Sequence, residues 1–152
     1  METLITGASS ATGRLLVKEL LDRGETVRVI VREGSSFPEA YKNHEKLNLI
    51  TGSILEQSGK ELAELVSGCG SIVSCLGHNL SLRGICGHPR RLVTDATRRL
   101  CEAVRANKPG ETVKFVLMNT AGNSNRDLPE AISFKHRTVL GILRLLLPPQ
   151  PS

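Results

Sequence analysis

Residues 6–16 read TGASSATGRLL, and this stretch decides how the fold begins. It follows a short apolar run and precedes a helical one, yet from Thr6 to Gly13 it consists of glycine and small hydroxyl or methyl side chains. Small residues between a strand and a helix let another group approach the backbone, and the free N–H groups of a helix N-terminus bind anions. The stretch is therefore either a tight structural turn or a phosphate site.

Strand and helix patterns alternate along the chain from this stretch outward. β-Branched and apolar runs predict strands at 3–6, 26–31, 47–51, 71–76 and 113–118. Helical periodicity predicts helices at 13–23, 60–66, 92–105 and about 129–147. Because strands that alternate with helices form βαβ units with right-handed crossovers, the predicted fold is α/β, a doubly wound parallel sheet of about five strands with helices on both faces.

The length of 152 residues predicts one domain, over residues 1–147, followed by a disordered tail at 148–152. The first helix is expected to bury Leu15, Leu16, Leu20 and Leu21 and to stop at Gly24. The helix at 60–66 is expected to bury Leu62, Leu65 and Val66. The helix at 92–105 is expected to bury its own apolar face. The helix at 139–147 is more apolar than a surface helix needs, which predicts a contact either with a second copy of the chain, in a homodimer, or with a segment that a longer relative would supply.

Composition excludes several classes of function. The net charge is +5, but the basic residues are spread out, no recognition motif accompanies them, and there are only 3 Phe, 1 Tyr and no Trp, so nucleic acid is not an expected partner. No apolar run is long enough for a membrane span. The 4 cysteines show no paired metal-ligand spacing, which predicts reduced thiols, no metal and a cytoplasmic protein.

In a doubly wound fold, the turn between the first strand and the first helix is where a dinucleotide pyrophosphate lies. The second strand ends in VIVR, so Arg32 follows the loop at about the distance where a residue contacts the adenosine ribose. An acid there favours NAD, whereas an arginine suits the 2′-phosphate of NADP. Glu33 comes next and leaves some tolerance for NAD. The predicted cofactor is NADP, with NAD less favoured.

Five stretches resemble the atypical short-chain dehydrogenase/reductases, and within them the NAD(P)H-binding group that includes NmrA-like proteins and flavin or biliverdin reductases. They are TGASSATGRLLVKELLDRGETVRVIVRE at 6–33, LITGSIL at 49–55, SIVSCLG at 71–77, VTDATRRLCEAVRAN at 93–107 and FVLMNTAG at 115–122. The resemblance covers most of residues 3–122, and its first stretch is the most specific. It implies a Rossmann-like domain that binds NAD(P)H.

The resemblance also implies cofactor contacts. These are Gly7, Ser9, Ser10, Ala11, Thr12 and Gly13 around the pyrophosphate, Arg32 at the 2′-phosphate, Ser53 and Ile54 against the adenine, Cys75, Leu76 and Gly77 along the ribose, and Asn119, Thr120 and Ala121 at the nicotinamide end. Ser10 stands where the middle glycine of the loop is expected. Its Cβ near the phosphates predicts weaker binding or a displaced loop.

The chain departs from the resemblance at the catalytic residues. Short-chain dehydrogenases carry a Tyr-x-x-x-Lys pair, but the single tyrosine, Tyr41, falls in a predicted loop far from that position. Thr120 and Asn119 remain as weak catalytic candidates, since Thr120 can hydrogen-bond a substrate carbonyl, and His136 is a candidate proton donor. Members of the group continue for tens of residues more, so the resemblance implies a natural short form, an excised domain or a C-terminally truncated chain. In each case the substrate pocket is expected to be incomplete.

Three functions are compatible with these observations. The first is an oxidoreductase that passes a hydride from NADPH to a small planar acceptor such as a flavin or quinone, because such chemistry asks little of protein side chains. The second is a non-catalytic module that senses the NADP redox state. The third is a structural or interaction domain that binds no nucleotide. The missing Tyr-x-x-x-Lys pair leaves open whether the protein is an enzyme.

Overall fold

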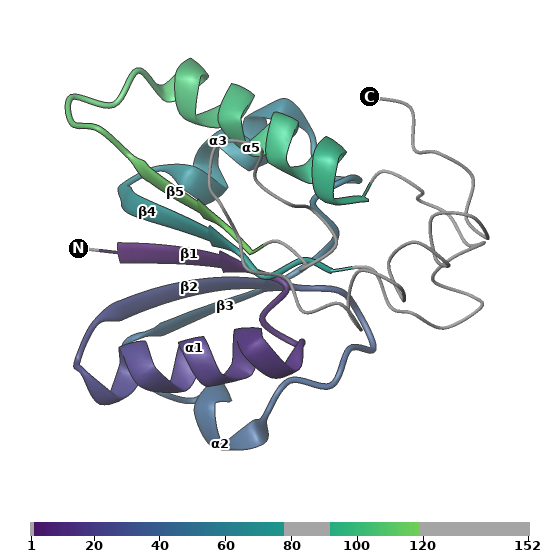
Figure 1. Ribbon diagram of the computed structural model, residues 1–152, viewed down its shortest axis with the longest axis vertical. Helices are drawn as coiled ribbons and strands as arrows, with labels where there is room; N and C mark the ends of the chain where they lie inside the picture. Colours follow the sequence, from purple (N-terminus) through teal and green to yellow (C-terminus); the bar gives the residue numbers. More distant parts are fainter. Residues whose placement is uncertain (1, 78–91, 119–152) are drawn as a thin grey trace, which may run out of the picture. The chain divides into compact units, whose positions relative to one another are not determined.

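A five-stranded parallel sheet forms the centre of the protein (Figure 1). The computed structural model describes residues 2–77 and 92–118. The strands are β1 (Glu2–Thr6), β2 (Thr26–Val31), β3 (Leu47–Thr51), β4 (Cys69–Ser74) and β5 (Lys114–Leu117). Their order in the sheet is β3-β2-β1-β4-β5, and every neighbouring pair is parallel. The first strand of the sequence is therefore the central strand, and the chain passes from one side of it to the other between β3 and β4.

The helices cover both faces of this sheet. They are α1 (Ala11–Asp22), α2 (Glu39–Lys42), α3 (Gly59–Val66) and α5 (Leu92–Asn107). Figure 1 shows α1 and α2 on one face, and α3 and α5 packed together on the other. The prediction of a doubly wound α/β sheet is confirmed. The predicted helix at about 129–147 and the tail at 148–152 lie outside the described residues.

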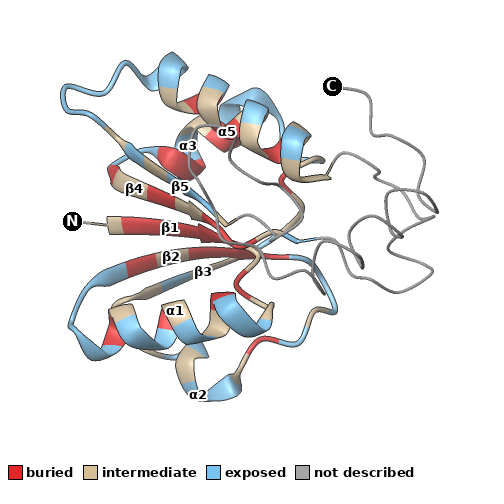
Figure 2. Ribbon diagram, viewed as in Figure 1, coloured by how far each residue is buried: buried red, intermediate tan, exposed pale blue. Residues whose placement is uncertain are grey.

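Successive side chains of each strand point to opposite faces of the sheet, and this alternation divides the core into two layers. Leu4, Ile30 and Ile72 pack with the buried side chains of α3 and α5, whereas Ile5 and Val29 pack with those of α1. The central strands are buried almost throughout, and the β5 edge is more exposed (Figure 2). Both faces of β1 and β2 are thus covered, as expected for a parallel sheet.

Helix α1 buries a different face from the one predicted. Its buried residues are Gly13, Val17 and Leu21, while Leu15 is 64% exposed, so the prediction that Leu15 faces the core is wrong. Leu16 and Leu20 flank the buried stripe as partly buried side chains. Gly13 explains the difference, because it must lie against the loop after β1, and residue 15 is about 200° around the helix from it. The contact at Gly13 sets the helix rotation.

The predicted end of α1 at Gly24 is confirmed. Gly24 has a φ of +75°, and its N–H donates to the carbonyl of Leu21 at 2.9 Å. The N–H of Glu25 donates to the carbonyl of Leu20 at 2.9 Å, which completes a Schellman cap. In α3, Leu62, Leu65 and Val66 are buried as predicted.

Arg28 ties three segments together at the amino end of the sheet. Its guanidinium donates to both carboxylate oxygens of Glu2, from Nε to Oε1 at 3.1 Å and from Nη2 to Oε2 at 2.6 Å. The same guanidinium donates to the carbonyls at the end of α3, those of Glu64, Leu65 and Ser67. A charged donor at a helix C-terminus satisfies carbonyls that lack partners within the helix. β1, β2 and α3 are thereby joined.

Candidate functional site

Two glycines hold the TGASSATG loop tightly between β1, β4 and α1. Gly7 has a φ of +74°, and a Cβ at this position would lie 2.6 Å from the backbone carbonyl of Cys75. A Cβ on Gly13 would lie 2.3 Å from the carbonyl oxygen of Gly7 and 2.8 Å from the Cα of Ala8. Real side chains essentially never fit at such distances. Gly7 therefore makes the turn as predicted, and Gly13 packs the helix against the loop.

Ser10 caps helix α1 from the position predicted for a glycine. Its backbone, with φ −70° and ψ 161°, is extended and open to any residue. Its hydroxyl accepts a hydrogen bond from the N–H of Gly13 at 3.0 Å and donates to the carbonyl of Cys75 at 3.4 Å. The loop thus accommodates a serine without backbone strain, and the serine fastens α1 to the end of β4.

The first turn of α1 leaves two backbone N–H groups for a ligand. The N–H of Arg14 is bound by the carbonyl of Ser10 at 2.9 Å, and that of Gly13 by the Ser10 hydroxyl. Within the described part of the chain, the N–H groups of Ala11 and Thr12 have no hydrogen-bond acceptor. Free N–H groups and the positive end of the helix dipole attract anions. The loop therefore offers two N–H donors of the kind that bind anions.

A pocket of about 200 Å³ opens beside this loop, at the carboxyl ends of the strands. The residues that the sequence proposed and that line it are Gly7, Ser9, Ser10, Arg32, Ser53, Ile54, Cys75, Leu76 and Gly77. Ala11, Thr12 and Gly13 do not line it, and Asn119, Thr120 and Ala121 lie outside the described residues. Small-molecule pockets generally measure roughly 300–1,000 Å³, so this pocket is smaller than a typical small-molecule site.

The pocket also contains residues that the sequence interpretation missed. They are Thr6, Ile30, Val31, Gly52 and Leu92. Thr6, Ile30, Val31 and Gly52 come at or just after strand ends, where the crevice of an α/β sheet lies, so the strand pattern could have identified them. Leu92 begins α5 and reaches the pocket only through the packing of that helix, for which the sequence has no local signal.

Buried hydroxyl groups lie beneath the pocket. Thr6 is 0% exposed and lines the pocket, and among the described residues its Oγ1 has no hydrogen-bond partner. Ser74 pairs with Thr6 in register on β4, and its buried Oγ is likewise without a partner there. Buried polar groups are normally satisfied by protein, water or ligand. The partners of these two hydroxyls are therefore not among the described side chains.

Arg14 and Arg32 differ in what their guanidinium groups bind. Arg14 donates from Nε to the carbonyl of Ser9 at 3.0 Å and from Nη2 to the carbonyl of Ser36 at 2.9 Å. These two bonds join the α1 loop to the segment after β2. Arg32 is exposed at the rim of the pocket. Its guanidinium makes no hydrogen bond or ion pair to any residue in the described ranges. Arg32 is therefore available to an anionic ligand.

Arg99 of α5 holds the opposite wall of the pocket. Its Nη1 donates to the carbonyl of Leu55 and its Nη2 donates to the carbonyl of Gln57, both in the loop between β3 and α3. Ser53 of this loop accepts from the N–H groups of Glu56 and Gln57 at 3.0 and 3.1 Å. The sequence interpretation missed Arg99, because nothing in a local pattern shows a contact between residues 44 positions apart.

The thiols in the described part are structural. Among the described residues, Cys69, Cys75 and Cys101 form no disulfide with one another. Burial raises the pKa of the Cys75 thiol, so this pocket residue is protonated at neutral pH and is a poor nucleophile. Tyr41 lies in α2 instead of the predicted loop, and it packs against the core layer under α1. It does not line the pocket.

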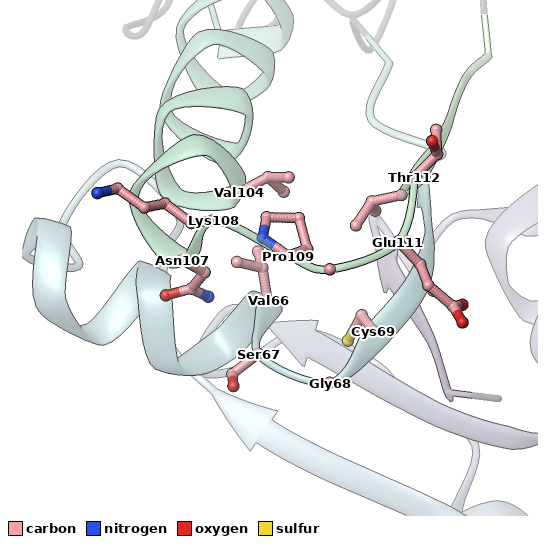
Figure 3. A pocket seen from close by; sticks show the side chains of 13 residues that line it. Val66, Ser67, Gly68, Cys69, Val104, Asn107, Lys108, Pro109, Glu111 and Thr112 are labelled. Carbon is pink, nitrogen blue, oxygen red and sulfur yellow. The ribbon is translucent and has the colours of Figure 1, made fainter.

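A larger cavity of about 440 Å³ lies at the opposite end of the sheet, between the α3–β4 turn and the loop from α5 to β5. Figure 3 shows Val66, Val104 and Pro109 near its centre, with the charged ends of Lys108 and Glu111 extending away to opposite sides. None of its lining side chains is a buried polar group without a partner within the described residues. Ligands of open α/β sheets bind at the carboxyl ends of the strands, which favours the smaller pocket.

Comparisons with known proteins identify the family of the chain. A family model described as NAD(P)H-binding matches residues 7–143. A search of curated proteins finds no match. Among solved structures, the UDP-glucuronic acid 4-epimerase of Bacillus cereus, in complex with UDP-glucuronic acid and NAD, is 19% identical, with a TM-score of 0.66 over 89% of this chain and 45% of its own.

Two further structures show the same fold. An epimerase from Methanothermobacter thermautotrophicus is 16% identical, with a TM-score of 0.67 over 89% of this chain and 40% of its own. A short-chain dehydrogenase/reductase from Veillonella parvula is 15% identical, with a TM-score of 0.60 over 80% of this chain and 48% of its own. The chain thus spans less than half the length of these structures. The family match supports a nicotinamide nucleotide as cofactor.

No helix in the described part of the chain is both long and apolar enough to cross a membrane. Within the same residues, no group of three or more His, Cys, Asp or Glu is placed to hold a metal ion.

Proposed function

The chain belongs to the NAD(P)H-binding family, and from this premise we propose that it binds NADP(H) in preference to NAD(H) at the carboxyl-end pocket. The N–H groups of Ala11 and Thr12, which lie beside the pocket at the start of α1, hold the pyrophosphate, and Arg32 holds the 2′-phosphate. Ser53 and Ile54 lie against the adenine, and Cys75, Leu76 and Gly77 along the ribose. The protein acts in the cytoplasm.

The guanidinium of Arg32, which binds no group in residues 2–77 and 92–118, is the observation that carries the NADP preference. It stands at the pocket rim directly after β2, where a doubly wound fold contacts the adenosine ribose. Two hydrogen bonds to its carbonyl, from the N–H and Oγ of Ser35 at 3.0 and 2.6 Å, fix the backbone of the turn. Gly34, with a φ of +71°, completes the turn. A fixed backbone that carries an unengaged guanidinium suits a phosphate dianion.

The proposed activity is the transfer of a hydride to a small planar acceptor such as a flavin or quinone. NADPH supplies the hydride when bound, so the chain has to bind and orient the nucleotide. Thr120 and Asn119 are proposed at the nicotinamide end, with Thr120 donating a hydrogen bond to the acceptor. The alternative is a non-catalytic sensor of the NADP redox state. The position of Tyr41, packed under α1 and away from the pocket, favours this alternative.

Calorimetric titration with NADPH, NADP⁺, NADH and NAD⁺ tests the cofactor. We expect the 2′-phosphorylated forms to bind more tightly, and Arg32→Ala to remove most of this preference, about 1–3 kcal/mol for a charge-assisted contact. The matched control is Arg23→Ala, since Arg23 is an exposed arginine at the end of α1 with only a 3.9 Å ion pair to Glu19. Equal affinities for NADPH and NADH in the unmodified protein would contradict the assignment of NADP(H) as the preferred cofactor.

Oxidation of NADPH in the presence of flavins and quinones, followed at the absorbance of the reduced nicotinamide, separates the two candidate functions. Acceptor-dependent oxidation that Thr120→Val slows supports the oxidoreductase. Tight NADPH binding without turnover on any acceptor of the panel supports the sensor.

A further inference from the structure

Ser10 occupies the position at which a dinucleotide-binding loop is expected to carry its middle glycine. In such loops this glycine lets the backbone approach the pyrophosphate. Here the position has an ordinary extended backbone, with φ −70° and ψ 161°. The hydroxyl is bound twice within the protein, by the N–H of Gly13 at 3.0 Å and by the carbonyl of Cys75 at 3.4 Å.

The first of these hydrogen bonds uses a group that an anion would otherwise bind. Helix α1 begins at Ala11, so the N–H groups of Ala11, Thr12 and Gly13 have no acceptor inside the helix. The Ser10 oxygen takes the third of them. The cap therefore acts as an internal substitute for a ligand oxygen and leaves two N–H groups for a phosphate.

The second hydrogen bond ties the side chain to the end of β4. Ser10 and Cys75 both line the pocket, Ser10 in the loop after β1 and Cys75 directly after the neighbouring strand β4. At 3.4 Å the bond to the Cys75 carbonyl is long for an O–H···O contact and is therefore weak. The serine side chain thus occupies the rim of the pocket beside the free N–H groups of α1.

We propose that Ser10 sets the affinity of the pyrophosphate site by holding it in a self-capped state, which a bound nucleotide must partly displace. This inference rests on the proposed function, because it takes a dinucleotide as the ligand. In this proposal Ser10 weakens nucleotide binding. Its cap keeps the loop ordered when no nucleotide is bound, and its competition for the Gly13 N–H makes the release of nucleotide faster. Such behaviour suits a protein that follows a changing ratio of NADPH to NADP⁺.

The stability and the affinity of Ser10 variants should change in opposite directions. Ser10→Ala removes an N-cap, so its melting temperature should fall by about 3–6 °C. It also frees the N–H of Gly13, so NADPH and inorganic pyrophosphate should bind about three- to tenfold more tightly. Ser10→Gly frees the same N–H, opens the crevice and keeps most of the cap stability. It should bind at least as tightly as Ser10→Ala, with a smaller loss of melting temperature.

The matched control is Ser9→Ala, which changes a neighbouring pocket serine for which the described residues show only a backbone contact, to Arg14. Calorimetry at a temperature well below the melting transitions keeps all variants folded. Tighter binding in both Ser10 variants and not in Ser9→Ala establishes the proposal. Unchanged or weaker binding in both Ser10 variants overturns it and leaves Ser10 as a structural cap or a ligand donor. If neither the unmodified protein nor any variant binds a dinucleotide, the proposed function fails as well.

Discussion

At the scale of single residues, the two loop glycines have different reasons to be glycine. Gly7 needs a positive φ of +74° and has no room for a side chain beside the backbone of Cys75. Gly13 is helical, and the obstacle to a side chain is the carbonyl oxygen of Gly7, 2.3 Å from an added Cβ. Both obstacles are backbone atoms, which cannot move without moving β1 or β4. The loop shape therefore depends on both positions.

We expect Gly13→Val to abolish nucleotide binding and leave a folded but less stable domain. The valine forces the start of α1 away from the Gly7 carbonyl, at a cost of about 1–3 kcal/mol in the free energy of unfolding. Circular dichroism during urea unfolding measures the stability, and calorimetry measures NADPH binding. The control is Gly59→Val, because a Cβ on Gly59 meets no atom within 4 Å. NADPH affinity retained in folded Gly13→Val would show that the loop is only a turn.

At the scale of elements, arginines on helices fasten the loops that form the pocket. Arg14 of α1 binds the loop carbonyl of Ser9 and that of Ser36 beyond β2. Arg99 of α5 binds the carbonyls of Leu55 and Gln57 between β3 and α3. A guanidinium suits this role because its planar fork donates to two acceptors at once. The pocket walls are thus positioned by residues that do not line the pocket.

Arg99→Lys should weaken NADPH binding, because an ammonium keeps the charge but cannot bridge the two carbonyls in the same geometry. We expect a loss of about 0.5–1.5 kcal/mol, the worth of one hydrogen bond, and faster amide exchange in the loop at 53–57. Arg98→Lys is the control, since Arg98 is exposed and makes only a 3.4 Å ion pair to Asp95. Equal exchange rates and affinities in the two variants would contradict a positioning role for Arg99.

The sequence predicted the elements better than the contacts between them. The strands at 26–31 and 47–51 were predicted to the residue, because β-branched runs bounded by polar residues are a local signal. Helix α2 was missed because a single turn has no periodicity. The exposure of Leu15, the cap at Ser10 and the contact of Arg99 depend on which elements meet in space. Local patterns therefore identified the loop that forms the site. They did not predict the hydrogen bonds that its side chains make.

At the scale of the whole molecule, apolar surface remains on β5. Val116 is 54% exposed and Leu117 is 44% exposed, on an edge strand of the described sheet. The predicted contact helix at 139–147 adds seven apolar residues to the chain, and it lies outside the described residues. Exposed apolar surface of this kind marks a contact with another segment or another protein.

We expect a homodimer at micromolar concentration, with the 139–147 segment at the contact. Light scattering measures the mass of the unmodified protein and of the double variant Leu143→Lys, Leu146→Lys, which should shift towards the monomer because charges are costly in an apolar interface. A monodisperse monomer, with the amides of 139–147 protected from hydrogen exchange, would show that the domain itself covers this segment.

The central place of β1 has a consequence for the order in which the protein is made. Glu2–Thr6 is synthesised before the other strands of the sheet, and its two neighbours come from residues 26–31 and 69–74. A nascent chain that has not reached Cys69 can pair β1 with β2 only, so one side of the most buried strand keeps its N–H and C=O groups unpaired. Such an edge is a template for association with other chains. Translation through β4 therefore supplies the strand that covers this edge.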